Sequence, residues 1–390
     1  MFAKTEKEWK EIGAAYTAEE IFQQPETWGK TFFQVRKVKE ELDAFTGVIT
    51  GQDDFDLILT GAGSSEYTGN SLAGNLQKEY RHHVKSYAST DITADPECYL
   101  SKEKPTLLVS FARSGNSPES LAVLQLAEQL CSEVRHLLIT CNGEGAMAGF
   151  GKERENCFTL VLSPETNDRA FAMTSSFTNM YLAAYLALHK GNMEQTAREL
   201  EDVIESASEF LEHGWETADR LVSGYDFDRI VYLGSTGLKG IAQESALKMC
   251  ELTQGKVDTQ YQSPMGFRHG PKSVIRDSAL TVIYLSGDPY TRQYEDDLIN
   301  EMVRERKGNR ILAVSCRKDE VTAAVDETIV FTLKNELPDV MNALLYILAG
   351  QLTALLKSLK CGIMPDDPCP SGEVNRVVKG VVIHPYGERS

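Results

Sequence analysis

The chain has 390 residues and a formal net charge of −17, because 57 Asp and Glu residues outnumber 40 Lys and Arg residues. This negative charge argues against sequence-independent binding to nucleic acid or to an anionic membrane surface. No run of about 18 uncharged apolar residues indicates a transmembrane helix, and the first twenty residues lack the apolar core of a secretory signal. Eight cysteines show neither CxxC spacing nor zinc-like pairing with His. We therefore expect a cytoplasmic, two-domain protein that holds no metal.

The first fifty residues are predicted to be helical. Apolar side chains recur in them at helical spacing, and no strand-like run interrupts the pattern. These side chains are Phe32, Val35, Val38, Leu42 and Phe45. We expect this segment to pack against the first domain.

Short apolar runs with strand character alternate with helix-like stretches over most of the remaining chain. This alternation predicts an α/β fold with parallel sheets. In the first half the runs begin at Asp56, Thr106, His136 and Phe158, and in the second half at Arg229, Leu280, Arg310 and Thr328.

The two halves of the chain resemble each other in layout. Gly61 follows the first strand, Gly234 follows its counterpart 173 positions later, and the next strands keep nearly the same offset. Each half then ends in a long apolar helix, FTNMYLAAYLALH and VMNALLYILAGQLTALLKSL. We therefore predict two copies of one domain. The predicted division is an N-terminal helical segment 1–50, a first domain 51–215, a second domain 216–365 and a tail 366–390.

The loop after the first strand, GAGSSEYTGN from Gly61, opens a predicted helix. In open parallel sheets, ligands bind beyond the carboxyl ends of the strands. Glu66 stands where a dinucleotide fingerprint needs its third glycine, and no G-K-[ST] follows, so neither that fingerprint nor a P-loop is present. Hydroxyls and N–H groups at a helix start suit a single phosphate, with Gly63, Ser64 and Ser65 as candidate ligands. A plain strand-to-helix turn is the alternative.

A second loop of this kind, SFARSGNSPES from Ser110, also joins a predicted strand to a predicted helix. Hydroxyls and backbone donors lie at the helix start, and an arginine adds the positive charge that an acidic protein needs locally for a phosphate. The candidate ligands are Arg113, Ser114, Asn116 and Ser117. The alternative is a well-capped helix with a proline in its first turn.

The second half carries titratable side chains in the corresponding region. Glu244, Lys248 and Glu251 lie at i, i+4 and i+7 of a predicted helix and so share one face. That face is either a surface stripe of ion pairs or the wall of a cleft. His269 follows in the turn-rich segment SPMGFRHGPKS. Histidine titrates near neutral pH, so a loop histidine is a candidate acid or base, the alternative being a histidine without a role.

These motifs resemble the sugar isomerase (SIS) domain proteins over about residues 50 to 385. In particular, they are similar to the tagatose-6-phosphate ketose/aldose isomerase family, also described as galactosamine-6-phosphate deaminase/isomerases. The strings that carry the resemblance are TGAGSSE, SFARSGNSPES, ITCN, AFAMTSSFTNM, YLGSTGLKG, ESALK, SPMGFRHGPKS, DPYTRQYE and NRVVKGVVIHPY. The resemblance implies two tandem SIS domains, each a three-layer α/β/α sandwich around a parallel, flavodoxin-like sheet, with N-terminal helices.

The resemblance extends to the isomerase half of glucosamine-6-phosphate synthase and implies roles for the loop residues. Ser65, Ser114 and Ser117 match phosphate ligands of that enzyme. Ala112 replaces a serine of its pattern, and we expect Arg113 to compensate for that loss.

The same resemblance implies roles for the titratable residues. Glu251 resembles the base that moves a proton between C1 and C2, and His269 resembles the ring-opening histidine, which in the synthase comes from the partner subunit. Glu244 and Lys248 resemble supporting active-site residues. Lys379, in the tail, stands where the synthase has a lysine able to form a Schiff base with the open sugar.

Together these features predict an enzyme that converts galactosamine 6-phosphate to tagatose 6-phosphate and ammonia, without a cofactor. The alternatives are isomerisation without deamination and a non-catalytic, sugar-phosphate-binding regulator. A DNA-binding regulator would carry a helix-turn-helix and a basic patch, which the sequence lacks. Phe2 stands where the synthase's glutaminase domain begins with cysteine, so we expect the degradative direction. We expect a homodimer or a dimer of dimers.

Overall fold

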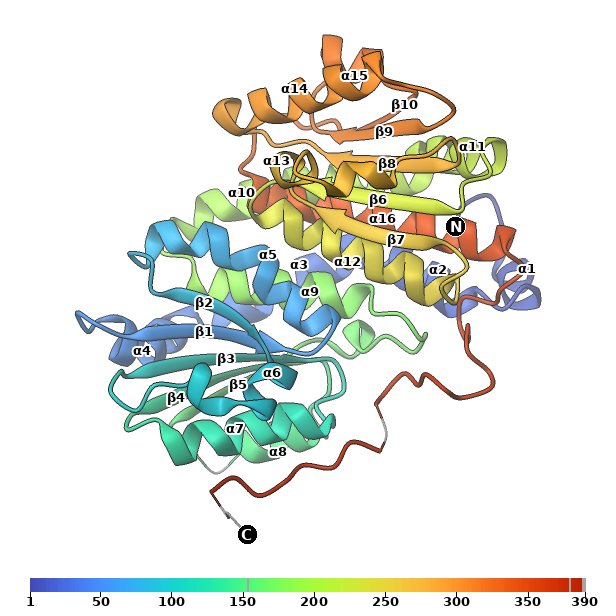
Figure 1. Cartoon of the computed structure of the whole chain (residues 1–390). Helices are drawn as coiled ribbons and strands as arrows, with labels where there is room; N and C mark the ends of the chain where they lie inside the picture. Colours follow the sequence, from blue (N-terminus) through green and yellow to red (C-terminus); the bar gives the residue numbers. More distant parts are fainter. Residues whose placement is uncertain (153, 379, 388–390) are drawn as a thin grey trace. The chain divides into compact units, whose positions relative to one another are not determined.

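The computed structural model describes residues 1–152, 154–378 and 380–387, and the chain falls into two compact units (Figure 1). The N-terminal helices are divided between the two units, and the C-terminal tail belongs to unit 2 from Gly372 onward. The predicted four-part division groups these segments differently and stays a prediction. Unit 1 consists of Met1–Glu26, Arg169–Thr174 and Glu194–Ser371, and unit 2 consists of Thr27–Asp168, Ser175–Met193 and Gly372–Ser390.

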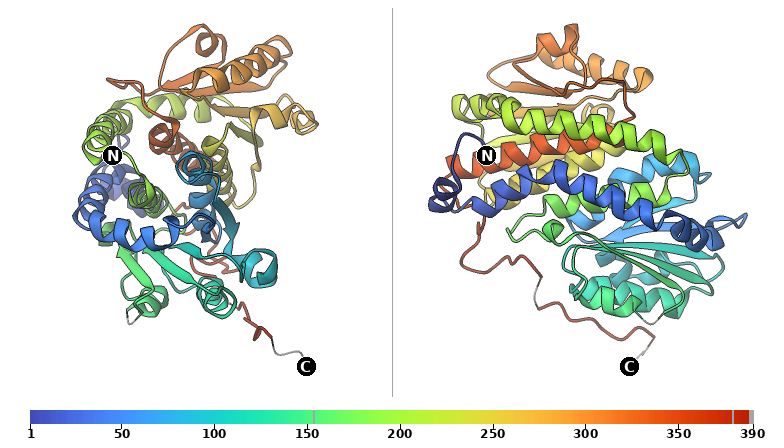
Figure 2. Two further views of the ribbon diagram at one scale, coloured as in Figure 1. Left: turned by 90° about the vertical axis from the view of Figure 1, so that its left-hand side faces the viewer. Right: turned by 180° about the vertical axis from the view of Figure 1, so that it is seen from behind.

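Five parallel strands form the sheet of unit 2, in the order β2-β1-β3-β4-β5. The strands are β1 (Asp56–Gly61), β2 (Val84–Ala88), β3 (Thr106–Ala112), β4 (Val134–Thr140) and β5 (Cys157–Val161). Helices cover both faces of the sheet (Figure 2), with α4, α5 and α9 on one face and α6, α7 and α8 on the other. The helices are α3 (Gln24–Lys37), α4 (Lys39–Thr50), α5 (Ser64–Glu79), α6 (Ser89–Ala94), α7 (Pro118–Leu130), α8 (Ala146–Gly151) and α9 (Ser175–Leu188), with short turns η1 (Pro96–Cys98) and η2 (Pro164–Thr166).

Unit 1 has a second sheet of five parallel strands, in the order β10-β9-β8-β6-β7. The strands are β6 (Arg229–Gly234), β7 (Asp258–Gln262), β8 (Ala279–Tyr284), β9 (Arg310–Ser315) and β10 (Glu327–Val330). Helices α11, α12 and α16 pack on one face, and α13, α14 and α15 on the other. The helices are α1 (Glu6–Glu11), α2 (Ala15–Phe22), α10 (Met193–Glu209), α11 (Glu216–Gly224), α12 (Gly237–Leu252), α13 (Pro264–Phe267), α14 (Pro289–Arg304), α15 (Glu320–Ala324) and α16 (Asp339–Lys360), with turns η3 (Phe210–Gly214) and η4 (Pro271–Val274).

The predicted α/β fold with parallel sheets is confirmed. A parallel sheet that is covered by helices on both faces needs strands that are apolar along their whole length. Strands β1, β3 and β8 are buried at every residue, which is why their sequences were recognised. Strands β2 (VKSYA) and β7 (DTQYQ) were missed, because they lie at a sheet edge and most of their side chains are polar and only partly buried.

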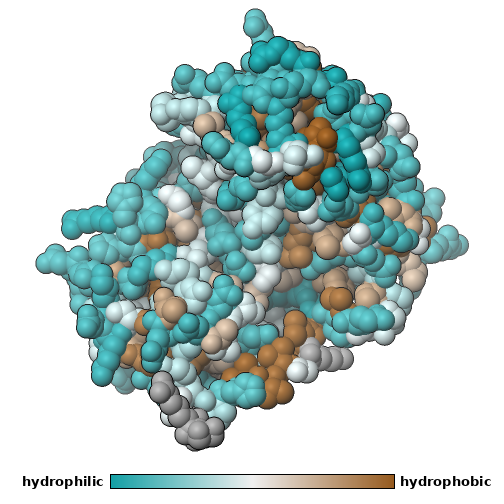
Figure 3. Space-filling model, in the orientation of Figure 1, coloured by the Kyte–Doolittle hydropathy of each residue, from teal (hydrophilic) through white to brown (hydrophobic). Residues whose placement is uncertain are grey.

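The long apolar helices that end each half of the sequence lie in the cores of the two units. Every residue of α9 is buried. By length and composition α16 could cross a membrane, but 89% of its most apolar stretch is buried inside the structure, as in a core helix. On the face shown in Figure 3, hydrophilic residues predominate, which fits a chain with a net charge of −17.

The 173-residue offset in the sequence corresponds to one and the same backbone turn. Gly63 (φ 56°, ψ −127°) and Thr236 (φ 50°, ψ −121°) both precede the helix that follows the first strand of their sheet. A Cβ on Gly61 would lie 2.6 Å from the carbonyl carbon of Ser65, and one on Gly234 would lie 2.3 Å from the carbonyl oxygen of the matching helix residue. Both turns therefore need a glycine at the end of the strand, because the helix backbone passes too close for a side chain.

Candidate active site

The loop after β1 brings hydroxyl groups to the start of α5. Gly63 has a positive φ, which turns the chain so that the helix begins at Ser64. Ser64 and Ser65 are both buried in the first turn of the helix. In the described part of the chain, the hydroxyl of Ser65 makes no hydrogen bond. A hydroxyl beside the N–H groups of a helix start is suited to an anionic group of a ligand.

The loop after β3 is held by the loop after β4. The side-chain amide of Asn142 donates to the carbonyl of Ser114 at 2.9 Å, and the N–H of Met147 donates to the carbonyl of Gly115 at 2.9 Å. The side-chain oxygen of Asn116 accepts from the N–H of Ala146 at 2.9 Å. Asn116, a predicted phosphate ligand, is therefore engaged in fixing the loop.

Both loops lie beyond the carboxyl ends of the strands in the sheet of unit 2. Strands β1 and β3 are neighbours, and Thr60 is paired with Ser110 just before the two loops begin. The structure thus brings the Ser64–Ser65 and Ser114–Ser117 segments to adjacent strand ends. The hydroxyls of Ser117 and Ser120 lie 2.6 Å apart.

Arg113 is buried and contacts the C-terminal tail. Its guanidinium donates to the carbonyl of Arg376 at 2.7 Å. The guanidinium of Arg376 in turn donates to the side-chain oxygen of Asn167 at 3.2 Å and to the carbonyl of Asp168. Sequence reasoning assigned Arg113 to the phosphate and missed Arg376, because no local pattern links residues 263 positions apart. Lys379, the predicted Schiff-base residue, lies outside the described residues.

Glu244, Lys248 and Glu251 form an ion cluster on α12 of unit 1. The Nζ of Lys248 lies 3.3 Å from Oε1 of Glu244 and 2.6 Å from Oε2 of Glu251. Glu244 and Lys248 are fully buried, whereas 24% of the Glu251 side chain is exposed. The cluster is therefore not the surface stripe that was the alternative reading of its spacing.

The charge state of the cluster follows from its geometry. Burial by itself would lower the pKa of Lys248, but the two carboxylates beside it outweigh burial and raise that pKa. Lys248 therefore stays a cation. Its ammonium group lies between the two carboxylates, 2.6 Å from the nearer oxygen of Glu251.

His269 lies in the exposed segment between α13 and η4. Arg268 and Lys272, in the same segment, both form ion pairs with Glu301 of α14. These ion pairs hold the segment against α14. Gly270, with φ 120°, turns the chain directly after the histidine. In the described residues the imidazole makes no hydrogen bond, so unit 1 presents it to solvent and does not join it to the α12 cluster by a contact.

No group of three or more His, Cys, Asp or Glu side chains in the described part of the chain is arranged to hold a metal ion. The polar groups that the structure brings together are instead hydroxyls and backbone donors in unit 2, and two carboxylates around a lysine in unit 1.

Comparisons with known proteins identify the family. The SIS domain model matches residues 53–190. The D-galactosamine-6-phosphate deaminase AgaS of Shewanella sp. (strain ANA-3) is 42% identical over 380 residues, which cover 96% of this chain and 93% of the relative. The crystal structure of tagatose-6-phosphate ketose/aldose isomerase from Escherichia coli matches with a TM-score of 0.88 at 37% identity, over 95% of this chain and 97% of that one. A crystal structure from Clostridium novyi NT matches with a TM-score of 0.96 at 40% identity, over 99% of both chains. The chain therefore belongs to the SIS domain family and, within it, to the group of D-galactosamine-6-phosphate deaminase AgaS proteins.

Proposed function

We propose that the protein is an amino-sugar-phosphate deaminase and isomerase, which converts galactosamine 6-phosphate and water to tagatose 6-phosphate and ammonia. The substrate follows from relatives of that name that are 40–43% identical along nearly the whole chain. The chemistry rests on the side chains of this chain.

The observation that carries the proposal is the cluster of Glu244, Lys248 and Glu251. A binding protein for sugar phosphates has no use for a buried lysine between two carboxylates, which costs desolvation energy. An isomerase needs a carboxylate base that is held in place by a neighbour and is still partly open to a ligand. Glu251 meets both conditions, because Lys248 contacts it and about a quarter of its side chain is exposed.

The reaction then runs through proton transfers. The sugar ring opens to an aldehyde at C1, which needs an acid or base, the role that we assign to His269. Glu251 removes the proton from C2 and returns it to C1, which leaves a C2 imine. Water adds to that carbon and the C2 nitrogen leaves as ammonia, so a ketose forms. No electrons are gained or lost overall.

The phosphate group serves to position the substrate. We assign it to Ser65, Ser114 and Ser117, with the N–H groups at the two helix starts of unit 2. Binding energy gained at the phosphate, far from C1 and C2, orients the reacting carbons. We assign Arg113 to holding the tail, because its guanidinium donates a hydrogen bond to the carbonyl of Arg376. The Schiff-base role of Lys379 stays a prediction.

The assembly and the compartment also belong to this proposal. We infer a homodimer or a dimer of dimers in which His269 serves the partner subunit, since this side chain is exposed and its imidazole forms no hydrogen bond or ion pair with the described residues. Light scattering on the eluting protein tests the oligomeric state, and an active monomer would contradict it. We expect the enzyme to act in the cytoplasm.

A single assay tests the reaction. The purified protein is incubated with galactosamine 6-phosphate and, separately, with glucosamine 6-phosphate, and both ammonia and ketose phosphate are measured. We expect equal amounts of ammonia and ketose from the galacto substrate. The second candidate, isomerisation without deamination, is favoured by the similarity to tagatose-6-phosphate ketose/aldose isomerase. Conversion of tagatose 6-phosphate to its aldose, with no ammonia from either amino sugar, would identify that activity instead.

A further inference from the structure

Unit 1 contains its own version of the two loops to which we assign the phosphate in unit 2. Strands β6 and β8 pair in the same way as β1 and β3, with Arg229 opposite Ala279 and Asp56 opposite Thr106. The offset of 173 positions places Gly287, after β8, at the position of Ser114.

In unit 1 a buried carboxylate joins the two loops. Glu295 lies on α14 and is fully buried. The hydroxyl of Ser235, in the loop after β6, donates to its Oε1 at 2.6 Å. The N–H of Ser286, in the loop after β8, donates to its Oε2 at 2.8 Å. One carboxylate thus receives hydrogen bonds from both strand ends, as a bound phosphate would.

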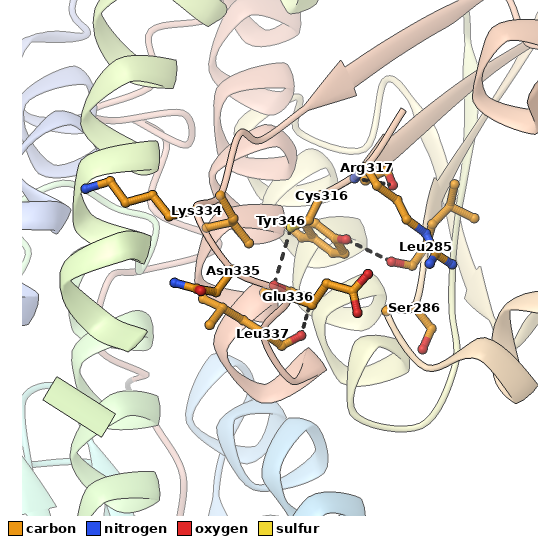
Figure 4. A pocket seen from close by; sticks show the side chains of 13 residues that line it. Leu285, Ser286, Cys316, Arg317, Lys334, Asn335, Glu336, Leu337 and Tyr346 are labelled. Carbon is orange, nitrogen blue, oxygen red and sulfur yellow. Dashed lines mark hydrogen bonds between the residues drawn. The ribbon is translucent and has the colours of Figure 1, made fainter. Parts of the chain in front are cut away.

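A second carboxylate takes the remaining donors of the loop after β8. Asp339, at the start of α16, accepts from the hydroxyl of Ser286 at 2.5 Å and from the N–H of Gly287 at 2.8 Å. Ser286 lines a cavity of about 200 Å³, together with the segments after β8 and β9 and the approach to α16. Figure 4 shows the side chains around this cavity. Four donors of these loops are therefore bound by two acidic side chains of the same unit.

Unit 2 has no carboxylate at the position of Glu295. The prolines that begin α7 and α14 align Leu124 with Glu295, and Leu124 is part of the apolar core. In the described part of the chain, the N–H of Ser114 donates to no protein acceptor, whereas the N–H of Gly287 donates to Asp339. Ser65 also has an apolar counterpart in unit 1, the buried Leu238.

We propose that Glu295 and Asp339 stand in for a phosphate group in unit 1, so that each chain binds one sugar phosphate, in unit 2, and that removing both acidic side chains uncovers a second anion site. The proposal rests on the assignment of the phosphate loops under the proposed function. On this proposal, the two acidic residues determine which half of the chain binds the substrate.

The first test counts binding sites on the wild-type protein. Titration calorimetry at pH 8 with galactitol 6-phosphate, a linear analogue, should give one site per chain. The double variant Ser65→Ala/Ser114→Ala should lose that site, with at least a tenfold rise in Kd. Two sites per chain, or a full-affinity site that survives in the double variant, would overturn the proposal.

The second test creates the new site in a background that lacks the first. Glu295→Ala and Asp339→Ala, which vacate the space of the two carboxylates, are added to Ser65→Ala/Ser114→Ala, and thermal unfolding is followed at pH 8 in inorganic phosphate and in chloride of equal ionic strength. Phosphate should raise the midpoint of the quadruple variant by several degrees and should leave the double variant unchanged. As a matched control, Asp297→Ala removes an acidic side chain from the exposed face of the same helix and should create no response to phosphate.

The outcomes separate this proposal from the proposed function. A quadruple variant that folds and does not respond to phosphate contradicts the stand-in role of the carboxylates. If that variant does not fold, the site count of the wild-type protein decides. Neither readout needs turnover, so a chain that binds one sugar phosphate but releases no ammonia would overturn only the proposed reaction.

Discussion

The Nζ of Lys248 lies 2.6 Å from a carboxylate oxygen of Glu251, one turn further along α12. This contact holds a carboxylate at the partly exposed end of an otherwise buried cluster. Glu251 is the side chain of the cluster that can reach a ligand, because Glu244 and Lys248 are fully buried.

Replacing Glu251 by glutamine should abolish proton transfer and spare binding. The amide keeps the shape of the side chain but cannot accept the C2 proton, so kcat should fall by about 10²–10⁴, the usual contribution of a general base. The Kd for galactitol 6-phosphate should stay within about twofold. Deuterium exchange at C2 in heavy water, followed by NMR, checks the step directly. Exchange at the wild-type rate would show that another residue is the base.

Lys248 should matter for stability as well as for chemistry. Lys248→Met leaves the buried Glu244 carboxylate without its cation, and breaking a buried pair costs about 3–5 kcal/mol of the free energy of unfolding. Urea unfolding at pH 8 measures this loss. The double variant Glu244→Gln/Lys248→Met removes both buried charges and should recover most of it. A single variant as stable as the wild type would mean that the pair contributes nothing to the folded state.

The spacing of these residues was readable from the sequence, but their burial was not. Positions i, i+4 and i+7 place the three side chains on one face of any helix. Whether that face meets solvent depends on α16, which packs against α12 although it begins almost ninety residues after α12 ends. The central strands, in contrast, could be predicted from the sequence, because each is a run of consecutive apolar residues. The edge strands β2 and β7 lack such runs and were missed.

The long-range contacts of the site left no trace in local patterns. The string SFARSGNSPES placed Arg113 in a phosphate loop, but its partner Arg376 lies in the tail. Glu295 belongs to the string DPYTRQYE, which helped to indicate the family without indicating a role. Its contacts with Ser235 and Ser286 depend on how α14 packs over the ends of two strands.

The hydroxyls of the phosphate loops should contribute to substrate affinity. Ser65→Ala and Ser114→Ala each remove a hydrogen bond to a charged group, so each should raise KM by the equivalent of about 1–3 kcal/mol, with a smaller change in kcat. Steady-state kinetics with galactosamine 6-phosphate measure both constants. Ser101→Ala, before β3 and thus at the other end of that strand, is the matched control and should leave KM unchanged. An unchanged KM in both loop variants would place the phosphate elsewhere.

The buried Arg113 should hold the C-terminal tail in place. Arg113→Ala removes the hydrogen bond to the carbonyl of Arg376, and a bond from a charged donor is worth about 1.5–3 kcal/mol. Amide hydrogen exchange in residues 372–378 should therefore speed up by roughly 10–100-fold, while exchange in β3 stays as it is. Arg154→Ala, which removes an arginine from the same unit, serves as the control. Equal exchange in the tail of both variants would show that Arg113 does not anchor it.

Glu295 should make the stability of the protein depend on pH. Burial raises the pKa of this carboxyl to about 7, although the donors Ser235 and Ser286 oppose the shift. The folded protein therefore holds this proton more tightly than the unfolded chain, whose glutamates titrate near pH 4.5. The stability that protonation contributes is fully present below about pH 4.5 and is lost as the pH rises through about 7. At about 1.4 kcal/mol per pKa unit, the loss amounts to roughly 3 kcal/mol.

We therefore expect the free energy of unfolding of the wild type, minus that of Glu295→Gln, to fall by this amount between pH 4.5 and pH 8. Urea unfolding at four or five pH values measures the difference, and Asp297→Asn should show no such trend. A constant difference across that range would mean that Glu295 keeps its ordinary pKa in the folded protein.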